Sequence, residues 1–203
     1  MPRASGSGEG PGSNPLETPR VPPSGAPRAA HICLIGLRGA GKTTVGQALA
    51  ERLRRPFHDL DELVLRRLGA RSVRAVFERE GEVAWRQGET AALAAFLAAP
   101  LGPSILALGG GAVMVDRIAE RLREAQRGGA VRVVLLDCDA RIAAERLSLD
   151  PGDRTSLTGR GLVEELEELH RQRADRYREL ADVTIDAAAG SATDVAASIV
   201  RGL

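Results

Sequence analysis

One glycine-rich segment of the chain carries the pattern of a phosphate-binding loop. Residues 36–43 read Gly-Leu-Arg-Gly-Ala-Gly-Lys-Thr, which fits G-x-x-x-x-G-K-[ST]. Lys42 is the only lysine among the 28 lysines and arginines of the chain, and its compact ammonium suits a narrow loop better than a broad guanidinium does. In such a loop the lysine reaches the β- and γ-phosphates, and the Thr43 hydroxyl binds Mg²⁺. The segment therefore predicts binding of a nucleoside triphosphate.

Two further segments place polar groups directly after apolar runs that read as strands. Asp59 and Asp61 follow Phe57-His58, so one carboxylate could hold a metal-bound water while the other meets a substrate hydroxyl. An N-cap of the next helix explains an aspartate here equally well. Residues 109–111 are three glycines, which leave space for a ligand to approach the backbone or simply make a tight turn.

Three arginines are candidates for binding anionic groups. Arg86 and Arg173 fall in long helical segments, where a lone arginine usually faces solvent. If both face a pocket, they could clamp a carboxylate, with about 1.5–3 kcal/mol for each charge-assisted hydrogen bond. Arg154 lies in a polar, glycine-flanked segment and could close over a transferring phosphate as part of a lid.

Strand and helix signals alternate along the chain. Short apolar segments predict strands at 31–35, 57–58, 104–108, 131–136 and 182–185. Helical spacing of apolar residues predicts helices at 42–54, 62–68, 73–79, 82–98, 116–126, 140–147, 162–180 and 191–201. This alternation predicts an α/β protein with an open parallel sheet covered by helices on both faces, and ligands in such sheets bind beyond the carboxyl ends of the strands.

Composition limits the domain organisation. Residues 1–29 are rich in Pro, Gly, Ser and Ala and predict a disordered tail, while 30–203 should form a single domain with a lid near 148–161. The tail lacks the apolar core of a secretory signal. Glu9, Glu17 and the prolines weigh against a transit peptide without excluding it.

Composition also bears on partners. Aromatic residues make up 2% of the chain and the net charge is +1, which disfavours a base-stacking platform or a basic stripe for nucleic acid. The sequence has no apolar run near 18 residues, so no membrane span is expected. Cys33 and Cys138 lie in or beside apolar runs and read as small buried hydrophobes, which favours a reducing, cytoplasmic setting.

Together these motifs resemble the shikimate kinase family of the nucleoside monophosphate kinase-like P-loop group. The resemblance covers about residues 31–203 and is carried by residues 36–43, Asp59-Leu60-Asp61, Arg86 after Glu82-Val83-Ala84-Trp85, residues 108–111, Arg154 and Arg173. It implies a three-layer fold with five parallel strands in the order 2-3-1-4-5, and a monomer. It also implies transfer of the γ-phosphate of ATP, with Mg²⁺, to the 3-hydroxyl of shikimate, a step of aromatic amino acid biosynthesis.

The resemblance implies a role for each matching residue. Lys42, Asp61 and Arg154 would be catalytic, with Asp61 binding the attacking hydroxyl. ATP would be bound by Gly39, Ala40, Gly41, Lys42, Thr43, Thr44, Arg146 and Arg154. Shikimate would be bound by Asp61, Arg86, Gly109, Gly110, Gly111 and Arg173. Thr43 and, through water, Asp59 would bind the Mg²⁺.

Two positions depart from the family pattern. Thr155 follows the lid arginine where proline is usual, and Asp175 stands where Arg-x-Pro-x-Tyr has its proline. Neither change removes a charged group of the expected mechanism. Two alternatives stay open: a gluconate kinase-like enzyme with the same fold, and a non-catalytic ligand sensor. The Asp-x-Asp, triple-glycine and two-arginine combination favours shikimate over gluconate as the substrate, and the presence of Lys42, Asp61 and Arg154 disfavours a sensor.

Overall fold

The computed structural model describes residues 31–99, 101–149 and 161–203. The expected tail at 1–29 lies outside the described residues. So do residues 150–160 of the expected lid, with Arg154 and Thr155.

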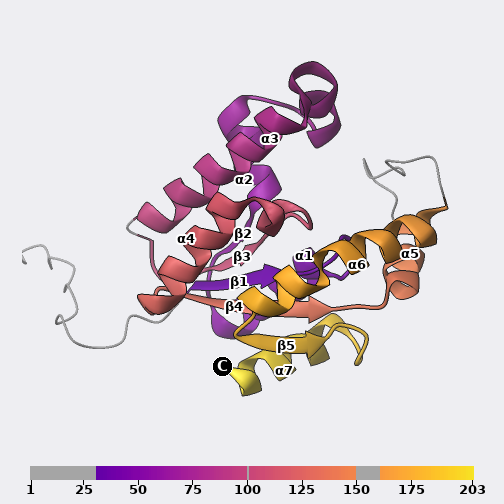
Figure 1. Cartoon of the computed structure of the whole chain (residues 1–203). Coiled ribbons are helices and arrows are strands. Elements are labelled where there is room, and N and C mark those ends of the chain that lie inside the picture. Colours follow the sequence, from indigo (N-terminus) through magenta and orange to yellow (C-terminus); the bar gives the residue numbers. More distant parts are fainter. Residues whose placement is uncertain (1–30, 100, 150–160) are drawn as a thin grey trace, which may run out of the picture.

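A parallel sheet of five strands forms the centre of the molecule, as expected (Figure 1). Its order is β2-β3-β1-β4-β5. The strands are β1 (His31–Ile35), β2 (Phe57–Asp59), β3 (Ile105–Ala107), β4 (Val131–Asp137) and β5 (Val183–Asp186). The central pairs are in continuous register, with Cys33 opposite both Leu106 and Val133. All carboxyl ends of these strands therefore meet at one edge of the sheet.

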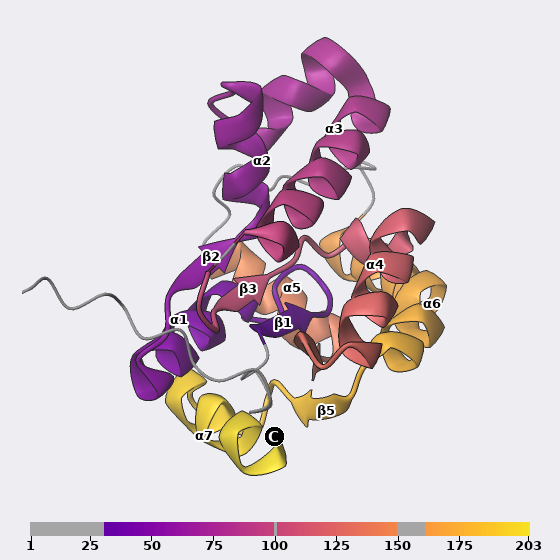
Figure 2. The ribbon, with the colours of Figure 1, turned by 90° about the vertical axis from the view of Figure 1, so that its left-hand side faces the viewer.

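Helices cover both faces of the sheet. They are α1 (Lys42–Leu53), α2 (Leu60–Leu68), α3 (Val73–Ala98), α4 (Asp116–Arg127), α5 (Ala140–Leu149), α6 (Leu162–Leu180) and α7 (Ala192–Gly202), with a short 3-10 helix at Ala112–Met114. Figure 2 shows α1 and α7 together on one side and α4 and α6 on the other. The result is the three-layer α/β/α arrangement that the sequence predicts.

Two helices, α2 and α5, have one end that lies two residues from the end predicted from the sequence. Helix α2 begins at Leu60 because the side chain of Asp59 accepts a hydrogen bond from the Asp61 N–H and caps the helix two residues early. The break expected between 73–79 and 82–98 is confirmed as a kink inside α3 at Gly81, whose φ of 82° is left-handed. Helix α5 continues to Leu149, two residues beyond its expected end.

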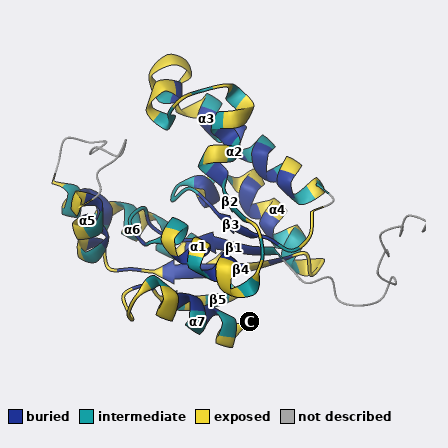
Figure 3. Cartoon of the chain, turned by 180° about the vertical axis from the view of Figure 1, so that it is seen from behind, coloured by how far each residue is buried: buried dark blue, intermediate teal, exposed yellow. Residues whose placement is uncertain are grey.

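The core is aliphatic and centred on β1, β3 and β4, whose buried residues Figure 3 shows in dark blue. Every residue from Ile32 to Ile35 is at most 1% exposed, as a parallel strand covered on both faces requires. Cys33 and Cys138 are both buried and both free thiols. Among the described residues, no helix is both long and apolar enough to cross a membrane.

Candidate active site

The phosphate loop joins the end of β1 to the start of α1, at the carboxyl edge of the sheet. Gly36 has φ 140°, and a Cβ there would lie 2.4 Å from the carbonyl oxygen of Leu136. Gly39 has φ 82°, and a Cβ there would lie 2.5 Å from the carbonyl oxygen of Ala143. Glycine is thus required at both positions by backbone angle and by close packing against β4 and α5. The loop leads directly into the N-terminus of α1, which favours anion binding.

The ammonium of Lys42 folds back over this loop. Its Nζ donates hydrogen bonds to the carbonyl oxygens of Gly36 at 2.8 Å and Leu37 at 2.7 Å. These contacts hold a positive charge at the centre of the loop, where phosphate oxygens can replace carbonyl oxygens as acceptors. Thr44, one residue further along α1, is exposed.

Asp59 has two functions in the structure. Its Oδ1 accepts the hydrogen bond that caps α2, and its Oδ2 accepts one from Oγ1 of Thr43 at 3.2 Å. The cap that the sequence offered is therefore confirmed, and the second carboxylate oxygen of Asp59 faces the phosphate loop. The helix cap fixes the carboxylate so that it faces the threonine hydroxyl of the phosphate loop.

The pair of Thr43 and Asp59 fits a magnesium ion. Mg²⁺ prefers oxygen ligands and in nucleotide sites combines one or two carboxylates with substrate phosphates. Among the described residues, no cluster of three or more His, Cys, Asp or Glu side chains could hold a metal ion. A cation here therefore needs the oxygens of a bound nucleotide to complete its shell.

Asp61 begins the second part of the site, where an alcohol substrate would lie. A Cβ added to Gly109 would lie 2.8 Å from Oδ1 of Asp61 and 3.0 Å from Oε1 of Glu89. The absence of a side chain at Gly109 thus makes room for two carboxylates beside the backbone. The negative charge of Asp61 also helps to raise the pKa of Glu89, although burial is the larger cause.

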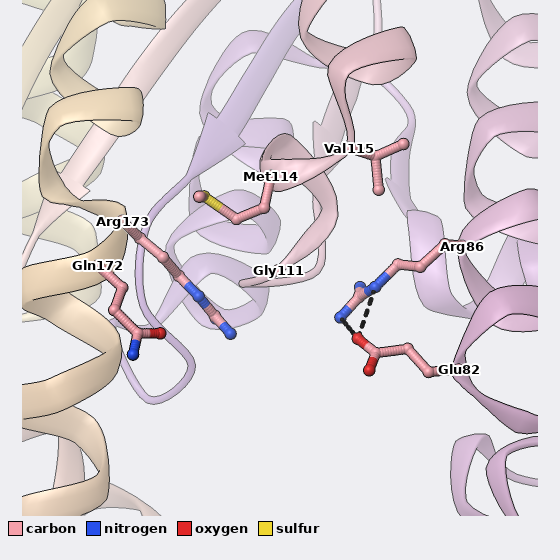
Figure 4. A pocket seen from close by; sticks show the side chains of 7 residues that line it. All are labelled: Glu82, Arg86, Gly111, Met114, Val115, Gln172 and Arg173. Carbon is pink, nitrogen blue, oxygen red and sulfur yellow. Dashed lines mark hydrogen bonds and ion pairs between the residues drawn. The ribbon is translucent and has the colours of Figure 1, made fainter.

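A pocket of about 390 Å³ opens beside these groups, within the range of small-molecule sites. Figure 4 shows Arg86 and Glu82 from α3 on one side of it and Arg173 and Gln172 from α6 on the other. Its remaining lining residues are Gly111, Met114 and Val115. Two guanidinium groups in one small pocket form a site for an anion such as a carboxylate.

Arg86 is held by carboxylates on two sides. Its Nη1 donates to Oε2 of Glu89 at 2.8 Å, and its Nε and Nη2 donate to Oε1 of Glu82 at 3.1 and 2.9 Å. The Glu89 side chain is 1% exposed and the Glu82 side chain 62% exposed. Glu89 is therefore the fixed partner, whereas Glu82 is open to solvent at the pocket.

Arg173 reaches the triple-glycine segment from the opposite side. Its Nη1 donates to the carbonyl oxygen of Gly110 at 3.0 Å, and the same oxygen accepts from Oη of Tyr177 at 2.5 Å. Asp175, which replaces a proline in the family pattern, lies on the exposed side of α6 and pairs with Arg178 at 3.1 Å. This departure therefore leaves the contact between Arg173 and Gly110 in place.

Arg146 borders the nucleotide end of the phosphate loop. A Cβ added to Gly41 would lie 3.7 Å from its Nη1, while its Nη2 donates to the carbonyl oxygen of Ala187 at 2.9 Å. The Nη1 of Arg146 also lies 3.9 Å from Sγ of Cys138. Burial raises the pKa of that thiol, and the arginine opposes the rise.

The sequence-predicted residues that the structure describes are thus gathered at one edge of the sheet. The sequence analysis did not predict two further residues, Glu89 and Tyr177. Glu89 follows Arg86 by three residues on a helix, a spacing that predicts a side-chain pair. No local pattern points from Tyr177 to Gly110, which is 67 residues away in the chain.

Comparisons with known proteins agree with this geometry. The shikimate kinase family model matches residues 38–203. A shikimate kinase of Syntrophus aciditrophicus is 40% identical over 182 residues, covering 84% of this chain and 89% of that protein. A shikimate kinase 2 of Escherichia fergusonii is 39% identical over 158 residues, covering 77% and 82%.

Solved structures give the same picture. A shikimate kinase from Acinetobacter baumannii in complex with shikimate has 35% sequence identity and a TM-score of 0.76, over 85% of this chain and 91% of that chain. A gluconokinase from Sinorhizobium meliloti, at 19% identity and a TM-score of 0.53, shares the fold alone. By sequence and by structure, this chain belongs to the shikimate kinase family.

Proposed function

We propose that this chain transfers the γ-phosphate of ATP to the 3-hydroxyl of shikimate, giving shikimate 3-phosphate and ADP. The observation that carries the proposal is the pocket in which Arg86 and Arg173 face one another beside Asp61 and the phosphate loop. That arrangement offers an anion site, a carboxylate for an alcohol and a triphosphate site within one small space. A relative of this family has been solved in complex with shikimate.

The alcohol side of the reaction is assigned to Asp61. Its carboxylate accepts a hydrogen bond from the substrate hydroxyl and takes the proton as the new oxygen–phosphorus bond forms. The bond from the γ-phosphorus to the β-phosphate oxygen breaks in the same displacement, and ADP leaves. Because phosphoryl transfer is accelerated mainly by in-line positioning and charge stabilisation, orientation of the hydroxyl is the main task of this residue.

The substrate carboxylate is assigned to the two arginines. Arg86 and Arg173 bind it from α3 and α6, and the backbone at Gly109, Gly110 and Gly111 lies along the ring of the substrate. Each charge-assisted hydrogen bond contributes about 1.5–3 kcal/mol.

The phosphates are assigned to the loop at residues 36–43 and the start of α1. Backbone N–H groups of Gly39, Ala40 and Gly41 donate hydrogen bonds to phosphate oxygens. Lys42 neutralises the β- and γ-phosphates, and Thr44 adds a hydroxyl at the exposed first turn. Arg146 borders the adenine. Arg154, outside the described residues, is assigned to the phosphates by the family resemblance alone.

Magnesium is assigned to Thr43 and, through water, to Asp59, which face each other across 3.2 Å. The bound ion supplies positive charge that offsets the negative charge of the phosphates. The cap that Asp59 makes on α2 holds its carboxylate toward the threonine hydroxyl.

We further propose that the enzyme acts as a monomer in the cytoplasm, with neither nucleic acid nor a membrane as partner. Two buried cysteines that are free thiols support a reducing compartment. We also propose that 30–203 is one catalytic domain, with residues 148–161 as its lid and 1–29 as a dispensable tail. Deletion of 1–29 should leave activity unchanged, which a truncated chain tests directly.

A coupled ADP-release assay with ATP and Mg²⁺ tests the reaction, with shikimate and gluconate compared at equal concentration. We expect turnover with shikimate and none above background with gluconate. Lys42→Ala should lower kcat by about 100-fold or more, because the positive charge beside the transferring phosphate is lost. Turnover with gluconate alone would identify the other kinase class. Nucleotide binding without turnover of either acid would favour a ligand sensor.

A further inference from the structure

A buried ion pair links the phosphate loop to helix α6, and none of the roles assigned above uses it. Nη2 of Arg38 lies 3.1 Å from Oε1 of Glu165, with side chains that are 17% and 3% exposed. Arg38 is the third residue of the phosphate loop, and Glu165 lies in the first turn of α6. Burying two charges costs several kcal/mol for each ion unless their geometry compensates, so such a pair needs a reason.

The backbone of Arg38 also touches the substrate side of the site. A Cβ added to Gly110 would lie 3.0 Å from the backbone nitrogen of Arg38. The carbonyl oxygen of the same Gly110 accepts hydrogen bonds from Arg173 and Tyr177, both on α6. Arg38 therefore contacts Gly110 through its backbone and α6 through its side chain.

Helix α6 is thus fixed to the centre of the site at two points. Glu165 and Arg173 are eight residues apart, which corresponds to roughly 12 Å along a helix. One attachment is the ion pair at Glu165, and the other is the pair of hydrogen bonds from Arg173 and Tyr177 to Gly110. Together with the packing of α6 against α4 and α5, these two attachments fix where the Arg173 guanidinium meets the pocket.

We propose that Arg38 and Glu165 are positioning residues for Arg173: their ion pair sets the place of α6 against the phosphate loop. This inference rests on the proposed function, since it concerns binding of the substrate carboxylate. Glu165 touches neither substrate. It acts through the helix, and its loss should weaken the one contact that depends on helix position.

A double-mutant cycle between Glu165 and Arg173 tests the inference, with kcat/KM for shikimate as the readout. Arg173→Ala should lower kcat/KM by about 100-fold, since it removes a charged partner of the carboxylate. Glu165→Gln should lower it by about 10-fold, through KM for shikimate and with KM for ATP unchanged. Because Glu165 acts through Arg173, the double variant should lose about 100-fold and not the product of about 1,000-fold.

Glu179→Gln is the matched control. Glu179 also joins α6 to another element, at Arg123 of α4, but its side chain is 57% exposed. The variant Glu179→Gln should keep the kcat/KM of the wild type. Combined with Arg173→Ala, it should lose no more than Arg173→Ala alone. Arg38→Gln breaks the same pair, so its loss in kcat/KM for shikimate should also be non-additive with that of Arg173→Ala.

The outcomes separate this inference from the proposed function. No turnover of shikimate by the wild-type chain would overturn the function itself. An active wild type with independent losses at Glu165 and Arg173 would overturn the positioning role and leave the function standing. If Glu165→Gln does not fold, Glu165→Asp keeps the charge and shortens the reach. It should show the same non-additive pattern at smaller amplitude, and independence there would equally overturn the inference.

Discussion

The guanidinium of Arg86 is fixed by a carboxylate that solvent hardly reaches: its Nη1 donates to Oε2 of Glu89 at 2.8 Å, and Glu89 is 1% exposed. The arginine side chain itself is 25% exposed, so it is buried at one end and open to the pocket at the other. The buried end fixes its orientation, and the open end is available to a ligand. An arginine held in this way loses less conformational entropy when it binds a carboxylate.

Glu89→Gln should therefore weaken binding of shikimate. The amide can accept one hydrogen bond from Arg86 but no longer supplies the charge that holds it. We expect KM for shikimate to rise by about 10-fold, with kcat at saturation within about 3-fold of wild type. Steady-state kinetics at saturating ATP measure both values.

Glu82→Gln is the comparison for this experiment, since Glu82 binds the same arginine but is 62% exposed. Exposed ion pairs contribute about 0–1 kcal/mol, so its effect on KM should be several-fold smaller. Equal effects at the two positions would show that burial of Glu89 does not matter for holding Arg86.

Glu89→Gln should also change how the free energy of unfolding depends on pH. Burial raises the pKa of Glu89 above its ordinary value of 4.5, and the ion pair with Arg86 only partly opposes the rise. A raised folded-state pKa gives stability that is fully present below 4.5 and is lost as the pH rises through the folded value. The glutamine of Glu89→Gln does not ionise, so the variant does not lose stability in this way. The difference in unfolding free energy, variant minus wild type, should therefore increase as the pH rises above 4.5.

Urea unfolding of both chains at several pH values from 4.5 to 8 measures this difference. The gain can be no steeper than about 1.4 kcal/mol per pH unit for one group. A difference that falls with rising pH would mean that the arginine outweighs burial and lowers the pKa of Glu89.

Gly111→Ala should disturb Arg86 from the other side. A Cβ at this position would lie 2.7 Å from Nη2 of Arg86, while the φ of −101° at Gly111 is open to any residue. The cost therefore falls on the side chain of the arginine and not on the backbone. We expect KM for shikimate to rise by roughly 10-fold with KM for ATP unchanged.

The control for this change is Gly102→Ala, where an added Cβ has no atom within 4 Å. It should leave both KM values unchanged. If Gly111→Ala behaves in the same way, the Arg86 side chain moves without cost and its position in the pocket is not fixed.

The sequence predicted the parts of the site that lie in local motifs. Residues 36–43 need their glycines for close packing and left-handed angles, so chemistry and spacing appear together in one segment. The strand order came from the family resemblance, because alternating strands and helices alone leave several orders possible. Residue roles carried by that resemblance stay predictions until variants are measured.

The contacts that the sequence could not predict are those between distant segments. Arg38 meets Glu165 across 127 positions in the chain, and Tyr177 meets Gly110 across 67. No periodicity or propensity records such distances, since they follow from how α6 crosses the edge of the sheet. At Asp59 the sequence offered a helix cap and a metal ligand as alternatives. The structure shows that one carboxylate has an oxygen for the cap and a second oxygen that faces Thr43.

Asp61→Asn tests the assignment of the catalytic carboxylate. The amide is nearly the same size and keeps the contact with the backbone at Gly109, but it cannot take the proton of the substrate hydroxyl. We expect kcat to fall by about 100-fold or more, with nucleotide affinity nearly unchanged. Single-turnover kinetics and calorimetric titration of ADP measure the two quantities separately. Because Asp61 is not a phosphate ligand, parallel losses in both would indicate a rearranged phosphate loop, and equal turnover in mutant and wild type would remove Asp61 from the mechanism.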